Sequence, residues 1–170
     1  YNTTWLGGQP MHRGPWYYSA EENLGFCGAI RSAATILADD PIFGRFCYGG
    51  IWTNDAGALK ITPLVGVRQR FHAMTTGGAM HLVLDNDHFA VGQSLSVAPN
   101  LTSITFTMET GNTASHSTPL HFTASLAGSY RLSDQSGTLA TFSALAGQET
   151  ELSLPFAAGG ATKTFSITQQ

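Results

Sequence analysis

Charged residues are what this sequence has least of. Only 11% of its 170 residues are Asp, Glu, Lys or Arg, less than half of the roughly 25% found in an average soluble domain. Eight Lys and Arg stand against eleven Asp and Glu, and Arg131 and Lys163 are the only basic residues after residue 100. Because nucleic-acid-binding proteins carry a basic patch or stripe, the sequence predicts no nucleic-acid partner.

Long apolar runs are also missing. No run approaches the roughly 20 apolar residues of a membrane span, so we expect no association with a membrane. Hydrophobic residues nevertheless make up 42% of the chain. That content is enough to bury a sizeable core and excludes global disorder.

Cysteine is scarce, with only Cys27 and Cys47 in the chain. The two could form a disulfide in an oxidising compartment, although Cys27 falls within a predicted helix, where small buried thiols are equally common. Asn2 and Asn100 each begin an acceptor triplet for N-glycosylation. With a composition rich in Ser and Thr, these features predict a secreted glycoprotein. Tyr1 follows no initiator Met or signal peptide, and we interpret it as a product of processing or truncation.

A helix is predicted within residues 1–50. Ser19 and Glu22 form a capping box, and apolar residues follow at helical spacing, namely Leu24, Cys27, Ile30, Ala34 and Leu37. Asp40 precedes Pro41 and therefore ends the helix. A single amphipathic helix cannot bury its apolar stripe alone. We therefore predict that residues 1–50 complete a larger helical domain; the alternative is that the helix packs on the rest of this chain.

From residue 51 onward the hydrophobic period is two. Ile104, Phe106 and Met108 alternate with polar residues, and the same pattern recurs at 120–124 and 152–156. Further strands are predicted at 59–61, 64–73, 79–84, 94–98, 128–132, 138–142 and 162–168. Many short strands separated by turn residues are typical of an antiparallel sandwich. The predicted fold is mainly β, an antiparallel β-sandwich of residues 51–170 preceded by the short helical segment.

The densest group of polar and aromatic residues lies between residues 12 and 23. Aromatic faces stack on sugar rings, and paired carboxylates can share acid and base work in glycoside hydrolysis. We therefore take as candidate catalytic residues Tyr17, Tyr18, Glu21 and Glu22, and as candidate substrate-binding residues His12, Arg13, Trp16 and Asn23. In an eliminating lyase, a tyrosine would act as general acid or base beside a cation that neutralises a uronate. The alternative is structural, because Glu22 caps the helix and Glu21 complements its dipole.

Other polar groups give weaker signals. Arg68, Arg70 and His72 share one face of the predicted strand 64–73, which is either a solvated face or an interface with an acidic partner. The stretch 85–88 lacks the remaining ligands of a calcium loop and is predicted to be an acidic turn. The histidines at 81, 88, 116 and 121 show no zinc spacing. No nucleotide-binding or nucleophile motif is present, so we predict neither a cofactor nor a metal site.

Several stretches together resemble the family called DUF5695. They are Trp16–Phe26, Ala29–Ala33, Asp40–Gly44, Tyr48–Gly50, Gly66–His72 and His81–Asp85. Proteins of that family are large and secreted, with a layout similar to toroidal (α/α) carbohydrate-active enzymes that carry β-sandwich domains. The resemblance implies that residues 1–50 are the end of a helical toroid and residues 51–170 an accessory C-terminal sandwich. The present chain is much shorter than a complete member.

Two functions follow from this reasoning. The first is the C-terminal part of a secreted glycoside hydrolase or polysaccharide lyase, partnered by a larger N-terminal chain or domain and acting on a polysaccharide. The second is a non-catalytic module that binds carbohydrate or serves a structural role. Because Phe106, Phe122 and Phe156 occupy the apolar phase of their strands, the sequence favours a bracing sandwich in an enzyme over an independent binder.

Overall fold

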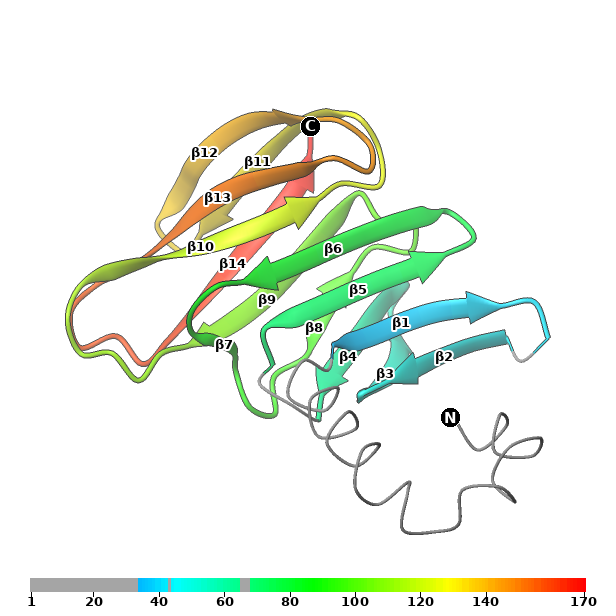
Figure 1. Cartoon of the computed structure of the whole chain (residues 1–170), viewed down its shortest axis with the longest axis horizontal. Helices are drawn as coiled ribbons and strands as arrows, with labels where there is room; N and C mark the ends of the chain where they lie inside the picture. The colour runs from blue at the N-terminus through cyan, green and yellow to red at the C-terminus, as the bar shows by residue number, and fades with distance from the viewer. Residues whose placement is uncertain (1–33, 43, 65–67) are drawn as a thin grey trace, which may run out of the picture. The chain divides into compact units, whose positions relative to one another are not determined.

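The computed structural model describes residues 34–42, 44–64 and 68–170 (Figure 1). The chain divides into two compact units, residues 1–32 and residues 33–170. All described residues belong to the second unit, and the account below concerns that unit alone. Helices long and apolar enough to cross a membrane are absent from the part of the chain described here.

The described residues form fourteen β-strands. They are β1 (Thr35–Asp40), β2 (Gly44–Tyr48), β3 (Gly50–Asp55), β4 (Ala58–Pro63), β5 (Arg70–Thr75), β6 (Gly78–Leu84), β7 (His88–Phe89), β8 (Leu95–Val97), β9 (Ser103–Glu109), β10 (His116–Thr123), β11 (Gly128–Asp134), β12 (Gly137–Ala144), β13 (Glu149–Phe156) and β14 (Thr162–Gln169). All pairings are antiparallel except that of β1 with β5. The prediction of a mainly β, antiparallel fold is confirmed.

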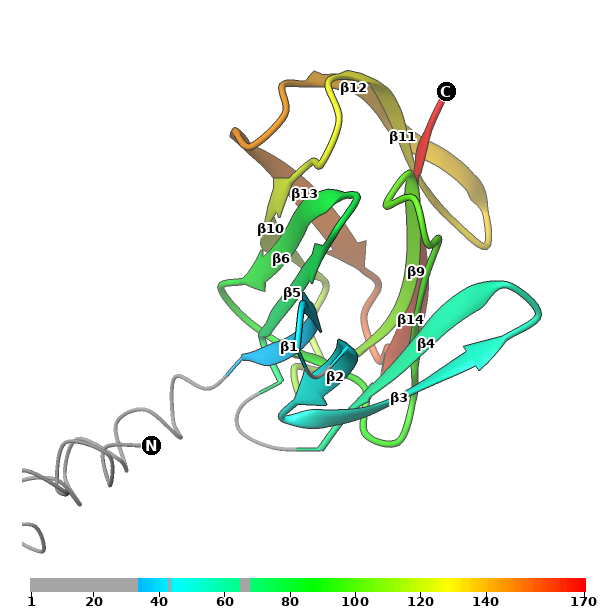
Figure 2. The same cartoon turned by 90° about the vertical axis from the view of Figure 1, so that its right-hand side faces the viewer.

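The strands form two sheets that face each other, as Figure 2 shows edge-on. One is six-stranded, in the order β13-β10-β6-β5-β1-β2, and the other is eight-stranded, in the order β12-β11-β14-β9-β8-β4-β3 with β7 beside β9. Alternate residues of each strand point inward, as the pleat requires. Their side chains form one continuous core that includes Phe71, Phe106, Phe122, Tyr130 and Phe165.

Local interactions fix the turns and corners of this sandwich. Ala56 and Gly57 both have positive φ in the two-residue turn between β3 and β4, the conformation whose twist matches a hairpin. The hydroxyl of buried Tyr130 donates a hydrogen bond to the carbonyl of Leu126, four residues earlier, at 2.8 Å. This bond is similar to the tyrosine corners of other sandwiches and fixes the entry to β11.

The strands predicted from residue 79 onward are confirmed, but the end of the predicted helix is wrong. Ala34 and Leu37 were assigned to its apolar stripe, whereas residues 35–40 form β1, with Thr35 and Leu37 buried on one face. Hydrogen bonding to β2 and β5 favours the extended conformation, and tertiary context of this kind overrides helix propensity. Strands β1 and β2 therefore extend the six-stranded sheet into residues that the sequence assigned to the helical segment.

The predicted strand 64–73 is also only partly correct. Strand β5 begins at Arg70, and Arg68 has a φ of +50°, a conformation that cannot continue a strand. Residues 65–67 lie outside the described part of the chain, as do residues 19–33 of the predicted helix.

Candidate functional site

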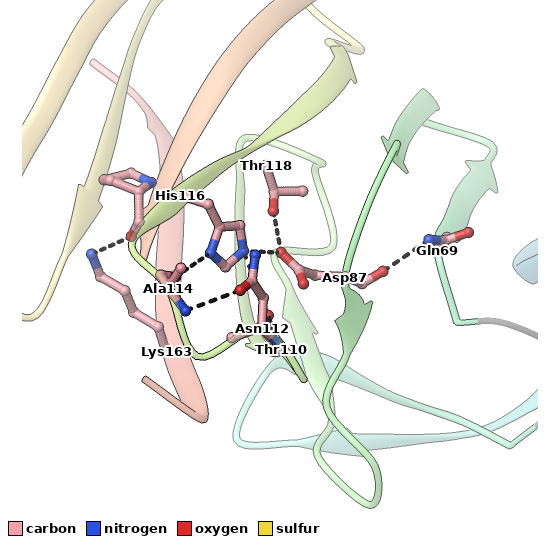
Figure 3. Close-up of polar contacts among 9 residues, drawn as sticks. Gln69, Asp87, Thr110, Asn112, Ala114, His116, Thr118 and Lys163 are labelled. Atoms are coloured by element: carbon pink, nitrogen blue, oxygen red, sulfur yellow. Dashed lines mark hydrogen bonds and ion pairs between the residues drawn. The ribbon is translucent and has the colours of Figure 1, made fainter. Parts of the chain in front are cut away.

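A group of hydrogen-bonded polar side chains lies at one end of the sandwich (Figure 3). The carboxylate of Asp87, in the turn before β7, accepts hydrogen bonds from the hydroxyl of Thr118 and from Nε2 of His116, the latter at 2.8 Å. Nδ1 of His116 donates to the carbonyl of Ala114 at 3.0 Å. We call Asp87, Ala114, His116 and Thr118 the Asp87 network.

Both ring nitrogens of His116 must be donors, because each faces an atom that only accepts. The bonds to the Ala114 carbonyl and to Asp87 raise the pKa of His116 above its ordinary value of 6.5. Burial raises the pKa of Asp87, but hydrogen bonds from Thr110, Thr118 and His116 outweigh it and hold that pKa below 3.8. The network therefore favours the ion pair between an imidazolium and a carboxylate.

This arrangement is suited to structural support. His116 has no nitrogen left to accept a proton, which a general base must do, and its ring stacks on Phe156 at a centroid distance of 5.2 Å. The backbone carbonyl of Asp87 accepts a further hydrogen bond from Nε2 of Gln69 at 3.0 Å. The network thus ties the turn between β6 and β7 to β10 and β13.

A second ion pair joins the segment that precedes β5 to β9 of the eight-stranded sheet. Nη2 of Arg68 lies 2.5 Å from Oε1 of Glu109, and the other carboxylate oxygen accepts from the backbone N–H of Val91 at 3.0 Å. Nε of Arg68 donates to the carbonyl of Phe89. Arg68 therefore does not share an outer face with Arg70 and His72, as the sequence predicted, because its positive φ turns the side chain toward the other sheet.

A third ion pair joins Lys163 to Asp134. Nζ of Lys163 lies 2.8 Å from the buried carboxylate of Asp134 and equally far from the carbonyl of Pro155, in the opposite sheet. The bonds from Lys163 and Ser136 lower the pKa of Asp134 to about 2.

A shallow depression on the surface is lined by His88, Glu109, Thr110, Gly111, Ala161 and Thr162. Glu109 is the one carboxylate in this lining, and its two oxygens accept hydrogen bonds from Arg68 and from the Val91 backbone. The depression therefore lacks a free carboxylate that could act as a base.

The outer face of the six-stranded sheet has a different character. One facing residue from each strand lies in a continuous row across it, from β2 to β13, comprising Tyr48, Ile36, His72, His81, Thr123 and Glu149. We call this set the cross-strand row. Neighbouring strands are about 4.8 Å apart, so the row is about 24 Å long. It changes from aromatic and aliphatic at β2 to hydroxyl and carboxylate at β13.

The β2 end of this face exposes apolar side chains. Phe46 and Tyr48 alternate outward along β2 and are 43% and 59% exposed, and Met74 on β5 is 42% exposed. Ala38 lies between Phe46 and Met74 in the register of the sheet. Exposed apolar patches on sheet faces commonly mark binding surfaces. The sequence missed this patch because β2 precedes residue 51, where the sandwich was expected to begin.

A pair of facing histidines occupies the centre of the row. His72 on β5 and His81 on β6 are opposite each other, with their Nδ1 atoms 2.6 Å apart and their ring centroids 4.6 Å apart. Burial lowers the pKa of both imidazoles, and the charges of His81 and Arg70 lower that of His72 further. Both rings are therefore neutral at pH 7, with one proton between the two facing nitrogens.

A further histidine lies on the same face, between two carboxylates. Nδ1 of His121 is 2.9 Å from Glu149 and its Nε2 is 3.1 Å from Asp85. The hydrogen bonds that His121 donates to Asp85 and Glu149 raise its pKa. Across the described residues, no group of three or more His, Cys, Asp or Glu side chains is arranged to hold a metal ion.

The candidate catalytic residues Tyr17, Tyr18, Glu21 and Glu22 lie outside the described part of the chain. The same holds for the candidate substrate-binding residues His12, Arg13, Trp16 and Asn23, and for Asn2 and Cys27. Their roles, and the disulfide between Cys27 and Cys47, remain predictions. Cys47 is partly buried on β2, and burial raises the pKa of its thiol.

Asn100, the other predicted glycosylation site, lies in an exposed turn. Its Oδ1 accepts hydrogen bonds from the hydroxyl of Thr102, at 2.7 Å, and from the Thr102 backbone. The buried neighbour Leu101 anchors this turn. Glycosylation at Asn100 remains a prediction, on a surface where an attached glycan would meet solvent.

The histidine pair was readable from the sequence, whereas the Asp87 network was not. The turn residues Thr76 and Gly77 join β5 to β6, and counting outward from them pairs 75 with 78 and therefore 72 with 81. Asp87 and His116 are 29 residues apart and lie in no common hairpin.

No protein-family model, curated protein or solved structure matches the chain.

Proposed function

We propose that the sandwich is a non-catalytic module that binds a polysaccharide along the outer face of its six-stranded sheet. In this proposal the module belongs to a secreted carbohydrate-active protein, as the resemblance to the DUF5695 family implies. The observation that carries the proposal is the cross-strand row, in which exposed Tyr48, with Phe46 beside it on β2, is followed by the neutral His72 and His81 and by Thr123, and which ends at the carboxylate of Glu149.

The chemistry of the row suits a polyol ligand. The rings of Phe46 and Tyr48 offer flat apolar surfaces to the C–H face of a sugar. Because the two Nδ1 atoms are hydrogen-bonded to each other, the pair of neutral rings offers one Nε2 donor and one Nε2 acceptor, and a hydroxyl provides both functions. His72, His81 and Thr123 therefore match the hydroxyl groups of a saccharide. A few polar groups placed beside aromatic surface are characteristic of small-molecule sites.

An enzymatic role would depend on residues elsewhere. Among the described residues, Asp87 and Glu109 are held in ion pairs, and His116 has both nitrogens engaged. In this proposal, a hydrolase or lyase reaction would use the predicted residues Tyr17, Tyr18, Glu21 and Glu22, or sequence upstream of them. In that case the sandwich would hold the polysaccharide near the catalytic cleft.

The experiment is affinity electrophoresis of the 170-residue chain in gels containing hydroxyethylcellulose, xylan, polygalacturonate or chondroitin sulfate. We expect at least one of these to retard the wild type. Replacing an aromatic ring that stacks on a sugar should weaken binding by about fivefold to tenfold, so Phe46→Ala and Tyr48→Ala should each reduce retardation and the double variant should abolish it.

Leu145→Ala is the matched control, since Leu145 is exposed and apolar but lies in the turn between β12 and β13. It should be retarded like the wild type. Absence of retardation in every gel, or full retardation of the Phe46→Ala/Tyr48→Ala variant, would show that this face does not bind these polysaccharides.

A further inference from the structure

We propose that His72 and His81 form a two-histidine site for a divalent transition-metal ion, with Cu²⁺ as the ion of best fit. The site uses the two facing Nδ1 atoms as ligands and leaves the remaining coordination positions to water or to an incoming ligand. It is independent of the proposed function, because metal binding at these atoms requires no sugar.

The positions of the two residues on the sheet bring the ligand atoms together. His72 and His81 are directly opposite on neighbouring antiparallel strands joined by a two-residue turn. Both side chains point to the outer face, since Phe71, Ala73, Met80 and Leu82 are the buried neighbours on β5 and β6. A short hairpin holds this register tightly, so the two rings are kept together before any metal arrives.

The distance between the nitrogens favours adjacent positions around a tetragonal ion. With bonds of about 2.0 Å from metal to imidazole, two ligands at 90° are about 2.8 Å apart, and two at a tetrahedral angle are about 3.3 Å apart. The observed separation of 2.6 Å is nearer to the first value. Square-planar or tetragonal nitrogen sites suit Cu²⁺ and Ni²⁺, and Cu²⁺ binds more tightly in the usual order of divalent metals.

The protonation state of the pair suits metal binding. One ring carries its proton on Nδ1 and donates to the other; moving that proton to Nε2 frees a second Nδ1 lone pair. No proton has to leave the protein, so both rings can bind the metal while neutral. Arg70 lies on the same face and opposes positive charge near His72, which limits the affinity without blocking the ligand atoms.

Two other histidines of the described part, His116 and His121, are poorer ligands. His116 and His121 have both ring nitrogens engaged by carbonyl or carboxylate oxygens, and a metal would have to displace those bonds. His121 is therefore a matched control, since it lies on the same face as the pair. Cys27, Cys47 and His12 can react with or bind Cu²⁺ in their own right and are removed for the test.

The experiment is a calorimetric titration with CuCl₂ of the full chain carrying His12→Gln, Cys27→Ser and Cys47→Ser, together with electron paramagnetic resonance. We expect one site that shows coupling to two nitrogens. Adding His72→Gln or His81→Gln should lower the Cu²⁺ affinity by at least about tenfold, and adding His121→Gln should leave it unchanged. Equal affinity in all variants, or no Cu²⁺ binding in the parent, would overturn the proposal.

A second measurement uses the unmodified pair and does not depend on how the variants fold. In NMR spectra, substoichiometric Cu²⁺ should broaden the signals of His72 and His81 first, then those of their row neighbours Ile36 and Thr123. Broadening that starts at His116, His121 or His88 instead would contradict the site.

Discussion

The two histidine arrangements of this sandwich differ in what surrounds the ring nitrogens. His116 is held between the Asp87 carboxylate and the Ala114 carbonyl, whereas His72 and His81 face each other. The first environment raises the imidazole pKa and the second lowers it. The same side chain is therefore stabilised in its charged form, with a structural role, at one end of the sandwich, and in its neutral form, available to a ligand, on the outer face.

The difference shows that burial alone does not decide the role of a histidine here. All three rings are partly buried, but only His116 has acceptors on both sides. A histidine with both nitrogens bonded stabilises the fold, whereas one that shares a single proton with a neighbour keeps a lone pair for a ligand.

The largest effect should come from removing the charge of Asp87. Asp87→Asn keeps the size of the side chain and tolerates the φ of +55°, but it removes the carboxylate that pairs with His116 and accepts from Thr118. Because a hydrogen-bonded imidazolium would lose its partner, we expect the free energy of unfolding to fall by about 2–3 kcal/mol. Urea denaturation at pH 6 would measure this.

Asp85→Asn serves as the control for that variant. Asp85 is half-exposed and pairs only with His121 among the ion pairs of the described residues, so its replacement should cost less than about 1 kcal/mol. Equal losses in the two variants would mean that the Asp87 network contributes no more than a surface pair.

The next effect is a difference in pH dependence between His116→Gln and His72→Gln. The folded state raises the pKa of His116, so its contribution is complete below pH 6.5 and is lost as the pH rises through the raised pKa. The folded state lowers the pKa of His72, so stability is retained above pH 6.5 and is lost as the pH falls. The folded state lowers the pKa of Asp87, so the contribution of its carboxylate to stability is lost only as the pH falls below 3.8.

Urea midpoints between about pH 5 and pH 8.5 would reveal the two opposite slopes. Relative to the wild type, His116→Gln should be most destabilised at low pH. His72→Gln should gain relative stability there, measured in chelator-treated protein. If the stability of both variants relative to the wild type changed with pH in the same direction, the opposite pKa shifts of His116 and His72 would be contradicted.

The smallest effect should come from Glu149→Gln. This side chain is 61% exposed although it pairs with His121 at 2.9 Å. Exposed ion pairs contribute little and are screened by salt, so we expect a change within about 0.5 kcal/mol at low salt and none at 1 M NaCl. A loss as large as that of Asp87→Asn would show that the outer face is as rigidly organised as the network.

The sequence predicted most of the sandwich where polar and apolar residues alternate clearly. Strand β9 buries alternate apolar residues along its whole length, and β10, β13 and β14 do so over part of theirs. This pattern is what a half-buried strand must show. Strand β3 exposes most of its residues and gave no such signal. Strand β1 is short, and its buried Thr35 and Leu37 alternate over only two positions. Leu37 also follows Ala34 at the helical spacing of three residues, so the helical pattern extended into this strand.

The same limits explain what was missed in the candidate site. Phe46 and Tyr48 lie on an edge strand whose inward residues are Arg45 and Cys47, so no apolar alternation indicated β2. The partners of Asp87 come from turns and strands distant in sequence, and their approach depends on how the two sheets close. The hairpin that pairs His72 with His81 is local, and the spacing around its turn was enough to define the register.

Strand β14 has a consequence for how the protein is made. It is the last strand of the sandwich in chain order, yet it lies between β9 and β11 within the eight-stranded sheet. During synthesis, β9 and β11 must wait with unpaired edges until residues 162–169 have left the ribosome. Because unpaired strand edges promote aggregation, the nascent chain should depend on chaperones until this central strand is inserted.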